Sequence, residues 1–120
     1  MRLHVFAALA RQLEADHQEL IGFLAGALAR ALPGAVTVRR RGLLGARSVS
    51  AVEVLLGQRQ YEVHVRHGRL ETVVAQVVGG VVLRHDPVAV DAWVEGLLGD
   101  LERLAMESDA ARAALERLVR

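Results

Sequence analysis

Three side chains that can exchange protons are predicted to lie side by side on neighbouring strands of a β-sheet. With a four-residue turn at residues 57–60, the register that puts the valines on one face sets Glu53 opposite His64 and His64 opposite Glu71. An imidazole between two carboxylates is favoured in its charged form, so this row could act as a pH-sensitive contact, a proton shuttle or a weak metal site. The alternative, which we favour, is a solvated row of opposite charges that stabilises an open sheet face.

The same region offers too few well-placed ligands for a metal ion. His64 and His67 are three residues apart at a strand end, a spacing that points their rings to opposite faces. A structural zinc ion needs four ligands, and the next candidates along the chain, His85 and Asp86, show no evident proximity to the first two. The sequence therefore predicts no metal site.

A basic run joins the first two predicted strands and surrounds two leucines that have no evident core to enter. Such a segment can dock on a protein partner, an anionic membrane surface or a nucleic-acid backbone. It can equally be a hairpin loop whose leucines tuck under the sheet while its arginines keep an edge strand soluble. We predict it as the partner-binding site, formed by Arg39, Arg40, Arg41, Leu43, Leu44 and Arg47.

The chain lacks the residues and motifs of most enzymes. It contains no cysteine, which excludes disulfides, thiolate metal sites and cysteine nucleophiles. Its serines, Ser48, Ser50 and Ser108, lie in no nucleophile-elbow sequence, and no phosphate-binding loop, dinucleotide fingerprint or HExxH motif occurs. Acidic pairs on the predicted C-terminal helix, such as Asp100 with Glu102, fit a solvated helix face. We therefore expect a non-catalytic protein without a cofactor.

Length and composition fit one folded domain over residues 1–120. Of the 120 residues, 52% are hydrophobic and 24% are charged, values typical of a globular protein. The formal net charge of +1 argues against a broad basic surface for nucleic acid. The longest apolar region, residues 20–32, is shorter than the roughly 20 residues that span a bilayer. We reject a secretory signal at the N-terminus and expect a cytoplasmic protein without a transmembrane segment.

Hydrophobic spacing predicts an α+β domain in the order α-β-β-β-β-β-α. Apolar residues at seven-residue spacing predict a long N-terminal helix within residues 1–34. Alternating valines predict an antiparallel meander of four to five strands over residues 35–85. Asp86-Pro87 opens a long C-terminal helical segment over residues 86–120, which Ser108-Asp109 could divide in two. We expect two layers, with the helices on or beside the sheet.

The two helical segments carry more apolar surface than one face of a sheet can cover. A second copy of the chain would cover the excess, and we predict a homodimer with a self-complementary two-fold contact. The predicted interface residues are Leu20, Phe23, Leu24, Leu28, Leu97, Leu101 and Leu104. Whether residues 109–120 pack on their own chain or on the other copy stays open.

The predicted function is a non-catalytic, homo-oligomeric adaptor that binds a protein partner through the arginine-leucine loop or a sheet edge. One alternative is a small nucleic-acid-binding dimer of the nucleoid-associated type, which would use Arg39–Arg41 and Arg47 and bind in a salt-dependent way. Another alternative is a carrier of a small apolar ligand held between helices and sheet. A closed apolar cavity would favour the carrier.

Overall fold

The computed structural model describes residues 17–42, 48–67 and 69–119. In these residues one helix, five strands and two further helices follow one another. Their bounds are α2 (His17–Ala31), β1 (Val36–Arg41), β2 (Ser48–Leu56), β3 (Arg59–Arg66), β4 (Arg69–Val78), β5 (Val81–Pro87), α3 (Val90–Ala105) and α4 (Asp109–Val119). The predicted α+β class and antiparallel meander are confirmed. The C-terminal segment forms two helices instead of the one in the predicted order, with the break at Ser108-Asp109 that the sequence allowed. Asp86-Pro87, predicted to open this segment, instead ends β5, and α3 begins at Val90. The first half of the predicted N-terminal helix lies outside the described residues.

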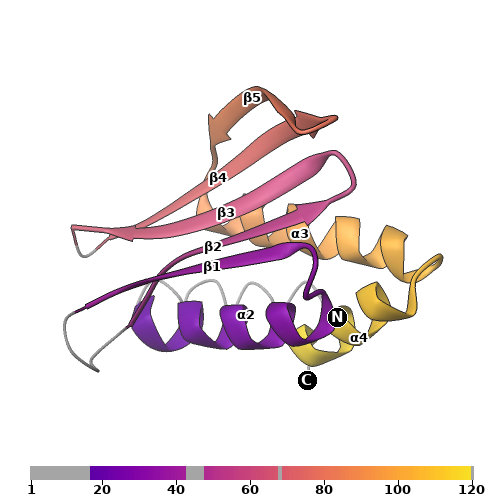
Figure 1. Cartoon of the computed structure of the whole chain (residues 1–120), viewed down its shortest axis with the longest axis horizontal. Coiled ribbons are helices and arrows are strands. Elements are labelled where there is room, and N and C mark those ends of the chain that lie inside the picture. The colour runs from indigo at the N-terminus through magenta and orange to yellow at the C-terminus, as the bar shows by residue number, and fades with distance from the viewer. Residues whose placement is uncertain (1–16, 43–47, 68, 120) are drawn as a thin grey trace.

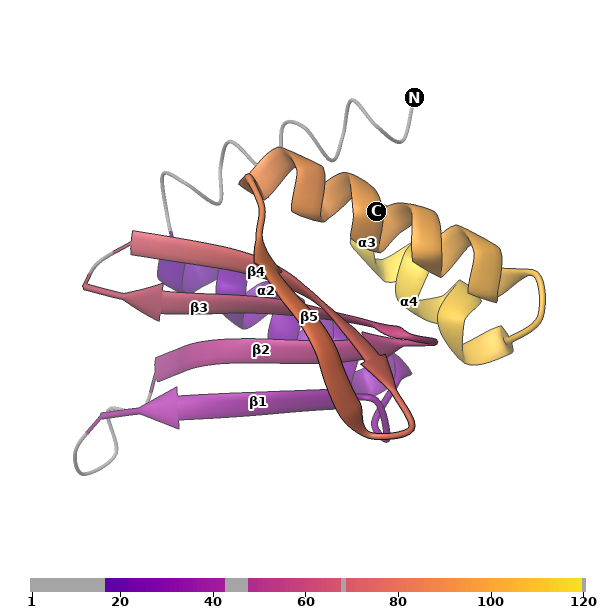
Figure 2. The ribbon, with the colours of Figure 1, turned by 90° about the horizontal axis from the view of Figure 1, so that it is seen from above.

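The sheet is a simple meander in which each strand pairs antiparallel with the next, in the order β1-β2-β3-β4-β5. Gly79-Gly80 forms a two-residue turn between β4 and β5, and both glycines have positive φ, +57° and +80°. Such a turn matches the twist of the strands that it joins and excludes most side chains, which explains the glycine pair. Figures 1 and 2 show that the β4–β5 hairpin twists strongly and that β5 runs obliquely over the face turned away from α2.

The register between β2 and β3 differs from the predicted one by two residues. Val54 pairs with Tyr61, rather than with Val63, because the turn contains only Gly57 and Gln58. Gly57 has a φ of +64°, which lets the chain reverse within two residues. A slip of two residues keeps every side chain on its face, so the apolar pattern alone could not distinguish the two registers. The β3–β4 register is confirmed as predicted, with His64 opposite Glu71.

The helices cover one face of the sheet and enclose the core (Figure 1). Trp93 of α3 is buried there, its ring lies edge-on to Tyr61 of β3 with centroids 6.0 Å apart, and its Nε1–H donates to the Val73 carbonyl at 3.1 Å. A buried indole needs such an acceptor, so this bond fixes α3 against β4. The other face of the sheet, which we call the open face, carries no helix among the described residues.

The C-terminal segment breaks after Ala105 and folds back as α4, which packs against both α3 and α2. Ser108 caps the new helix because its Oγ accepts the Ala111 N–H at 3.3 Å. A single helix over residues 90–119 would be about 45 Å long, longer than the 41 Å principal extent of the molecule. Folding back instead buries Ala114 and Leu118 in the core.

This fold-back accounts for most of the apolar surface that predicted a helical dimer interface. Four of the predicted interface residues are buried in the core of a single chain: Leu24, Leu28, Leu97 and Leu101. Leu104 is partly buried and packs against that core. Phe23 is 41% exposed, and the side chain of Leu20 lies outside what the structure describes. The helices therefore need no second copy to cover these leucines. No helix of the described residues has the length and apolar character that a membrane span requires.

Candidate functional site

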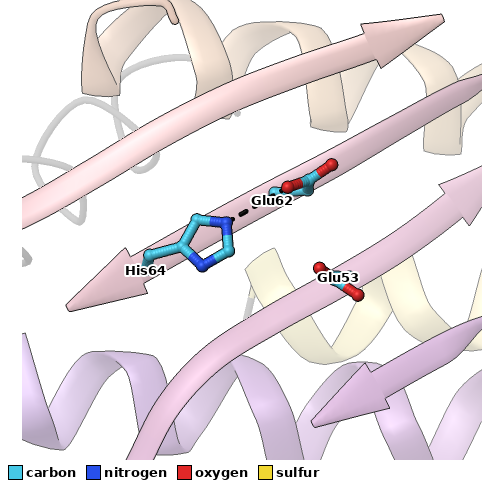
Figure 3. Close-up of side chains that lie close together, drawn as sticks. All are labelled: Glu53, Glu62 and His64. Atoms are coloured by element: carbon cyan, nitrogen blue, oxygen red, sulfur yellow. Dashed lines mark hydrogen bonds and ion pairs between the residues drawn. The ribbon is translucent and has the colours of Figure 1, made fainter. Parts of the chain in front are cut away.

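A buried carboxylate, Glu62 of β3, is the centre of a polar cluster on the open face. Its side chain collects three polar neighbours although the residue is only 6% exposed. Gln60 Nε2 donates to Oε2 at 3.0 Å, while His64 Nε2 lies 3.1 Å and His85 Nε2 3.4 Å from Oε1. Figure 3 shows His64 pointing along β3 toward Glu62, with Glu53 facing both from the neighbouring strand. We call Glu53, Glu62, His64 and His85 the Glu62 cluster.

Strand geometry places these residues together. Alternate residues of a strand point to the same face, so Gln60, Glu62 and His64 all lie on the open side of β3. Glu53 joins them because it is the β2 residue paired with Glu62. His85 reaches the cluster from β5 across β4, and the residue paired with it there is Ala75, whose methyl group leaves room for the imidazole to pass. The oblique path of β5 in Figure 2 brings this strand toward β3.

The neighbours of Glu62 determine its charge state. Burial raises the pKa of its carboxyl group, but hydrogen bonds from Gln60, His64 and His85 and the charge of His85 lower it, and together they hold the pKa below its usual value. Glu62 is therefore ionised at neutral pH. One ligand atom each from Glu53, Glu62 and His64 lie within 4.8 Å of one another. The cluster thus combines carboxylate oxygens and imidazole nitrogens, the donor types that bind zinc-like metals.

The predicted row of Glu53, His64 and Glu71 forms only in part. His64 and Glu71 are paired in the backbone register, but the Glu71 side chain is exposed and lies 3.6 Å from the Arg66 guanidinium. Glu53 pairs with Glu62 instead of His64, because of the two-residue slip described above. The sequence placed Glu62 near this row on the same face but not at its centre, and it showed no proximity of His85 to His64. The central position of Glu62 follows from the β2–β3 register, and the approach of His85 depends on the twist of β5.

The predicted arginine-leucine site is described only in its first half. Arg39, Arg40 and Arg41 are the last residues of β1, while Leu43, Leu44 and Arg47 lie outside the described residues. A pocket of about 280 Å³ beside β1 is lined by Arg39, Arg40, Arg41, Ser50, Ala51, His64, Val65 and Arg66. Two of its cations already have acidic partners, since Arg39 lies 3.6 Å from Glu53 and Arg66 pairs with Glu71. This pairing reduces the positive charge available to a phosphate backbone.

A second buried carboxylate lies on the opposite face of β3, at the contact with α3. The Tyr61 hydroxyl donates to Asp100 Oδ2, and the guanidinium groups of Arg59 and Arg103 form ion pairs with Oδ1. Asp100 is 4% exposed, so the predicted solvated helix face is wrong at this position. The signal that could have revealed it is its place between two core residues of α3, Leu97 and Leu101. We call this group the Asp100 cluster.

A cavity of about 530 Å³ lies between α3 and the edge of the sheet formed by β4 and β5. Apolar and charged residues both line it, and they include Tyr61, Val74, Arg59, Arg84 and Asp86. A carrier of an apolar ligand needs a mainly apolar lining with few polar groups. This cavity does not meet that requirement.

Comparisons of the chain with protein-family models, with curated proteins and with solved structures find no match.

Proposed function

We propose that this chain is a non-catalytic interaction protein that self-associates through the outer edge of β5. The observation that carries the proposal is a run of three exposed apolar side chains on this strand. Val81, Val82 and Leu83 are 59%, 55% and 58% exposed, and Val78, across the Gly79-Gly80 turn, is 40% exposed. We call these four residues the β5 apolar edge. Exposed large apolar side chains gathered at one end of a hairpin in this way are typical of interaction sites.

The two edges of the sheet differ in their protection against pairing. At the β1 edge, Arg39, Arg40 and Arg41 are exposed, and charged residues on an edge strand oppose the approach of another strand. On β5 the first charge comes only at Arg84. Among the described residues no strand pairs with the outer side of β5. The β4–β5 register shifts between Gln76 and Val77, so Leu83 is an extra residue in β5, and this bulge is the only interruption of the described edge before Arg84. The rest of this edge is open to another strand.

The far end of β5 has its own block against pairing. The Val88 N–H donates inward to the Thr72 carbonyl at 2.9 Å. Because neighbouring residues of a strand direct their backbone groups to opposite sides, the position of Pro87, which has no N–H, faces the outer edge. Strand addition is therefore directed to the first half of β5, where the β5 apolar edge lies.

The occupant that fits this edge best is a second copy of the chain. In an antiparallel pair with its two-fold axis at Val82, each Val81 lies opposite the Leu83 of the other copy, and no like charges face each other. An axis at Arg84 would oppose two guanidinium groups, which is unfavourable. The apolar run thus favours a two-fold contact that extends the sheet across both copies.

The mass of the protein in solution tests this proposal. Native mass spectrometry or light scattering should give twice the 13.0 kDa chain mass, and Val82→Arg should give the mass of one chain. The matched control is Thr37→Arg, which adds the same charge to the exposed β1 edge and should leave the dimer unchanged. A monomeric wild-type protein, or a Val82→Arg variant that stays dimeric, would contradict the proposal.

A further inference from the structure

The Glu62 cluster has the donor atoms, spacing and charge of a metal site. We propose that Glu53, Glu62, His64 and His85 bind one divalent cation of the zinc type, with ligands drawn from β2, β3 and β5. This inference is independent of self-association through the β5 apolar edge, and it departs from the expectation of no metal that the sequence supports.

Two distances within the cluster, both to Glu62 Oε1, suit tetrahedral coordination. Zinc lies about 2.0–2.1 Å from nitrogen and oxygen ligands, so two ligands of a tetrahedral ion are separated by about 3.3 Å. His64 Nε2 and His85 Nε2 lie 3.1 Å and 3.4 Å from Glu62 Oε1. Glu53, Glu62 and His64 form the base of the site, since one ligand atom of each lies within 4.8 Å of the other two. His85 is not part of this set, but its exposed side chain already contacts Glu62 Oε1 and would move toward the other ligands as the ion binds.

The surroundings of Glu62 prepare it for this role. Gln60 Nε2 donates to Oε2 at 3.0 Å, which fixes the carboxylate and leaves Oε1 turned toward both imidazoles. A hydrogen bond to the second oxygen of a ligating carboxylate is the outer-shell contact that metal sites commonly use. Glu62 and Glu53 together carry two negative charges, which match a divalent cation bound by neutral imidazoles. Binding would therefore compensate the buried charge of Glu62.

Competing contacts are weak enough to be displaced. Arg39 lies 3.6 Å from Glu53, but its side chain is mostly exposed, and exposed ion pairs contribute little. The imidazole contacts with Glu62 would be replaced by bonds from the same atoms to the metal. Imidazole ligands favour zinc and its neighbours over magnesium and calcium, which prefer all-oxygen sites. The bound ion would join β5 to β2 and β3.

Titration of the metal-free full-length protein with ZnCl₂, followed by calorimetry, tests the site. We expect one zinc ion per chain and a higher thermal midpoint in its presence. Glu62→Gln, His64→Gln and His85→Gln should each weaken zinc binding at least tenfold, as loss of a ligand does. His85→Gln keeps the test valid if the buried variants fold poorly, because His85 lies on an exposed strand with a side chain 56% exposed. MgCl₂ should produce no binding heat.

Two control substitutions separate this site from adventitious binding. Glu71→Gln removes a carboxylate from a position directly opposite His64, and His67→Asn removes an exposed imidazole three residues from it. Both variants should bind zinc as the wild type does. The proposal is wrong if wild-type protein binds less than one ion per chain, if His85→Gln leaves the affinity unchanged, or if either control weakens binding as much as the cluster variants.

Discussion

Glu62 of β3 and Asp100 of α3 are both almost completely buried carboxylates. They lie on opposite sides of β3, and the groups around them differ in kind. Asp100 is held by the Tyr61 hydroxyl, which donates to it, and by two guanidinium groups, which have no acceptor. Glu62 is held by an amide and two imidazoles. Imidazole nitrogens can donate, accept or bind a metal, so the Glu62 cluster can exchange partners. Asp100 is held by one hydrogen bond at Oδ2 and by ion pairs alone at Oδ1.

The comparison distinguishes a structural charge from a candidate binding site. Asp100 Oδ1 faces guanidinium groups, which can only donate, and Oδ2 accepts from the Tyr61 hydroxyl, so a carboxylate serves both positions without any partner changing its role. At Glu62, only Gln60 requires an acceptor, because each histidine can take either role according to its tautomer. Burial alone therefore does not identify function in this protein, and the chemistry of the partners does.

The largest effect is expected for Asp100→Asn. An asparagine has one oxygen, which can face either Tyr61 or the arginines. With the oxygen toward Tyr61, the amide NH₂ group faces the guanidinium groups; with the oxygen toward the arginines, the NH₂ group faces the Tyr61 hydroxyl, which must give up its present hydrogen bond. We expect the free energy of unfolding to fall by about 1–3 kcal/mol, the usual cost of an unsatisfied buried polar group. Urea denaturation followed by circular dichroism measures this change.

The arginines of this cluster provide a control. Arg59 is more than half exposed and Arg103 pairs with the same oxygen, so Arg59→Gln removes only one of two solvated cations. We expect a loss of stability below about 1 kcal/mol, as for other exposed ion pairs. If Arg59→Gln lowered the free energy of unfolding as much as Asp100→Asn, the charge of Asp100 would depend on Arg59 alone, and Arg103 could not replace it.

A smaller loss is expected for Gly96→Ala, which tests how firmly the Asp100 cluster holds Tyr61. A Cβ at this position would lie 3.1 Å from the Tyr61 hydroxyl oxygen and 3.2 Å from its Cε1. Tyr61 cannot move away easily, because Asp100 and Trp93 fix its two ends. Overpacking costs about 1–3 kcal/mol, and the better helix propensity of alanine returns about 1 kcal/mol, so the net loss should be about 1 kcal/mol.

Gly99→Ala is the matched control on the same helix. An added Cβ meets nothing within 4 Å there, and the position is exposed. Only the helix propensity changes, so the variant should be more stable than the wild type by up to about 1 kcal/mol. Opposite signs at the two glycines, measured by chemical denaturation, would confirm the close approach of Tyr61 to α3. Equal stabilisation by both substitutions would show that the Tyr61 side chain moves away from the added Cβ at little cost in free energy.

The sequence was sufficient for the features that depend on periodicity. Alternating valines predicted the antiparallel meander, and the β3–β4 register followed because it is the pairing that places Tyr61 beside Val74 and Val65 beside Leu70 on the core face. The division of the C-terminal helical region near Ser108-Asp109 was also visible, because Ser108 is a capping residue. Its start was not, because Asp86-Pro87 ends β5 and α3 begins after Ala89, which makes no side-chain cap. The features that were visible are local, so single-sequence patterns contain them.

The features that were missed depend on contacts distant in sequence or on a choice between equivalent local patterns. The β2–β3 slip of two residues preserves every face and was decided by the backbone of Gly57. The contact of His85 with Glu62 spans 23 residues and requires the twist of the β4–β5 hairpin. Asp100 was predicted to be solvated because its partners, Tyr61 and Arg59, lie about 40 residues earlier in the chain. No pattern within one element could reveal these partners.

The smallest effect is expected for Glu62→Gln in the metal-free protein, and this variant tests the comparison most directly. The glutamine oxygen can accept from Gln60 while its amide group donates to His64 and His85 as neutral imidazoles, so every existing contact has an equivalent. The charge itself gains from these hydrogen bonds and loses from burial, and the two effects oppose each other. We therefore expect unfolding in urea with EDTA to differ from that of wild type by less than about 0.5 kcal/mol. A loss as large as that of Asp100→Asn would instead mean that the ionised Glu62 is a structural charge of the same kind as Asp100, and the distinction between fixed donors and exchangeable imidazoles would not hold.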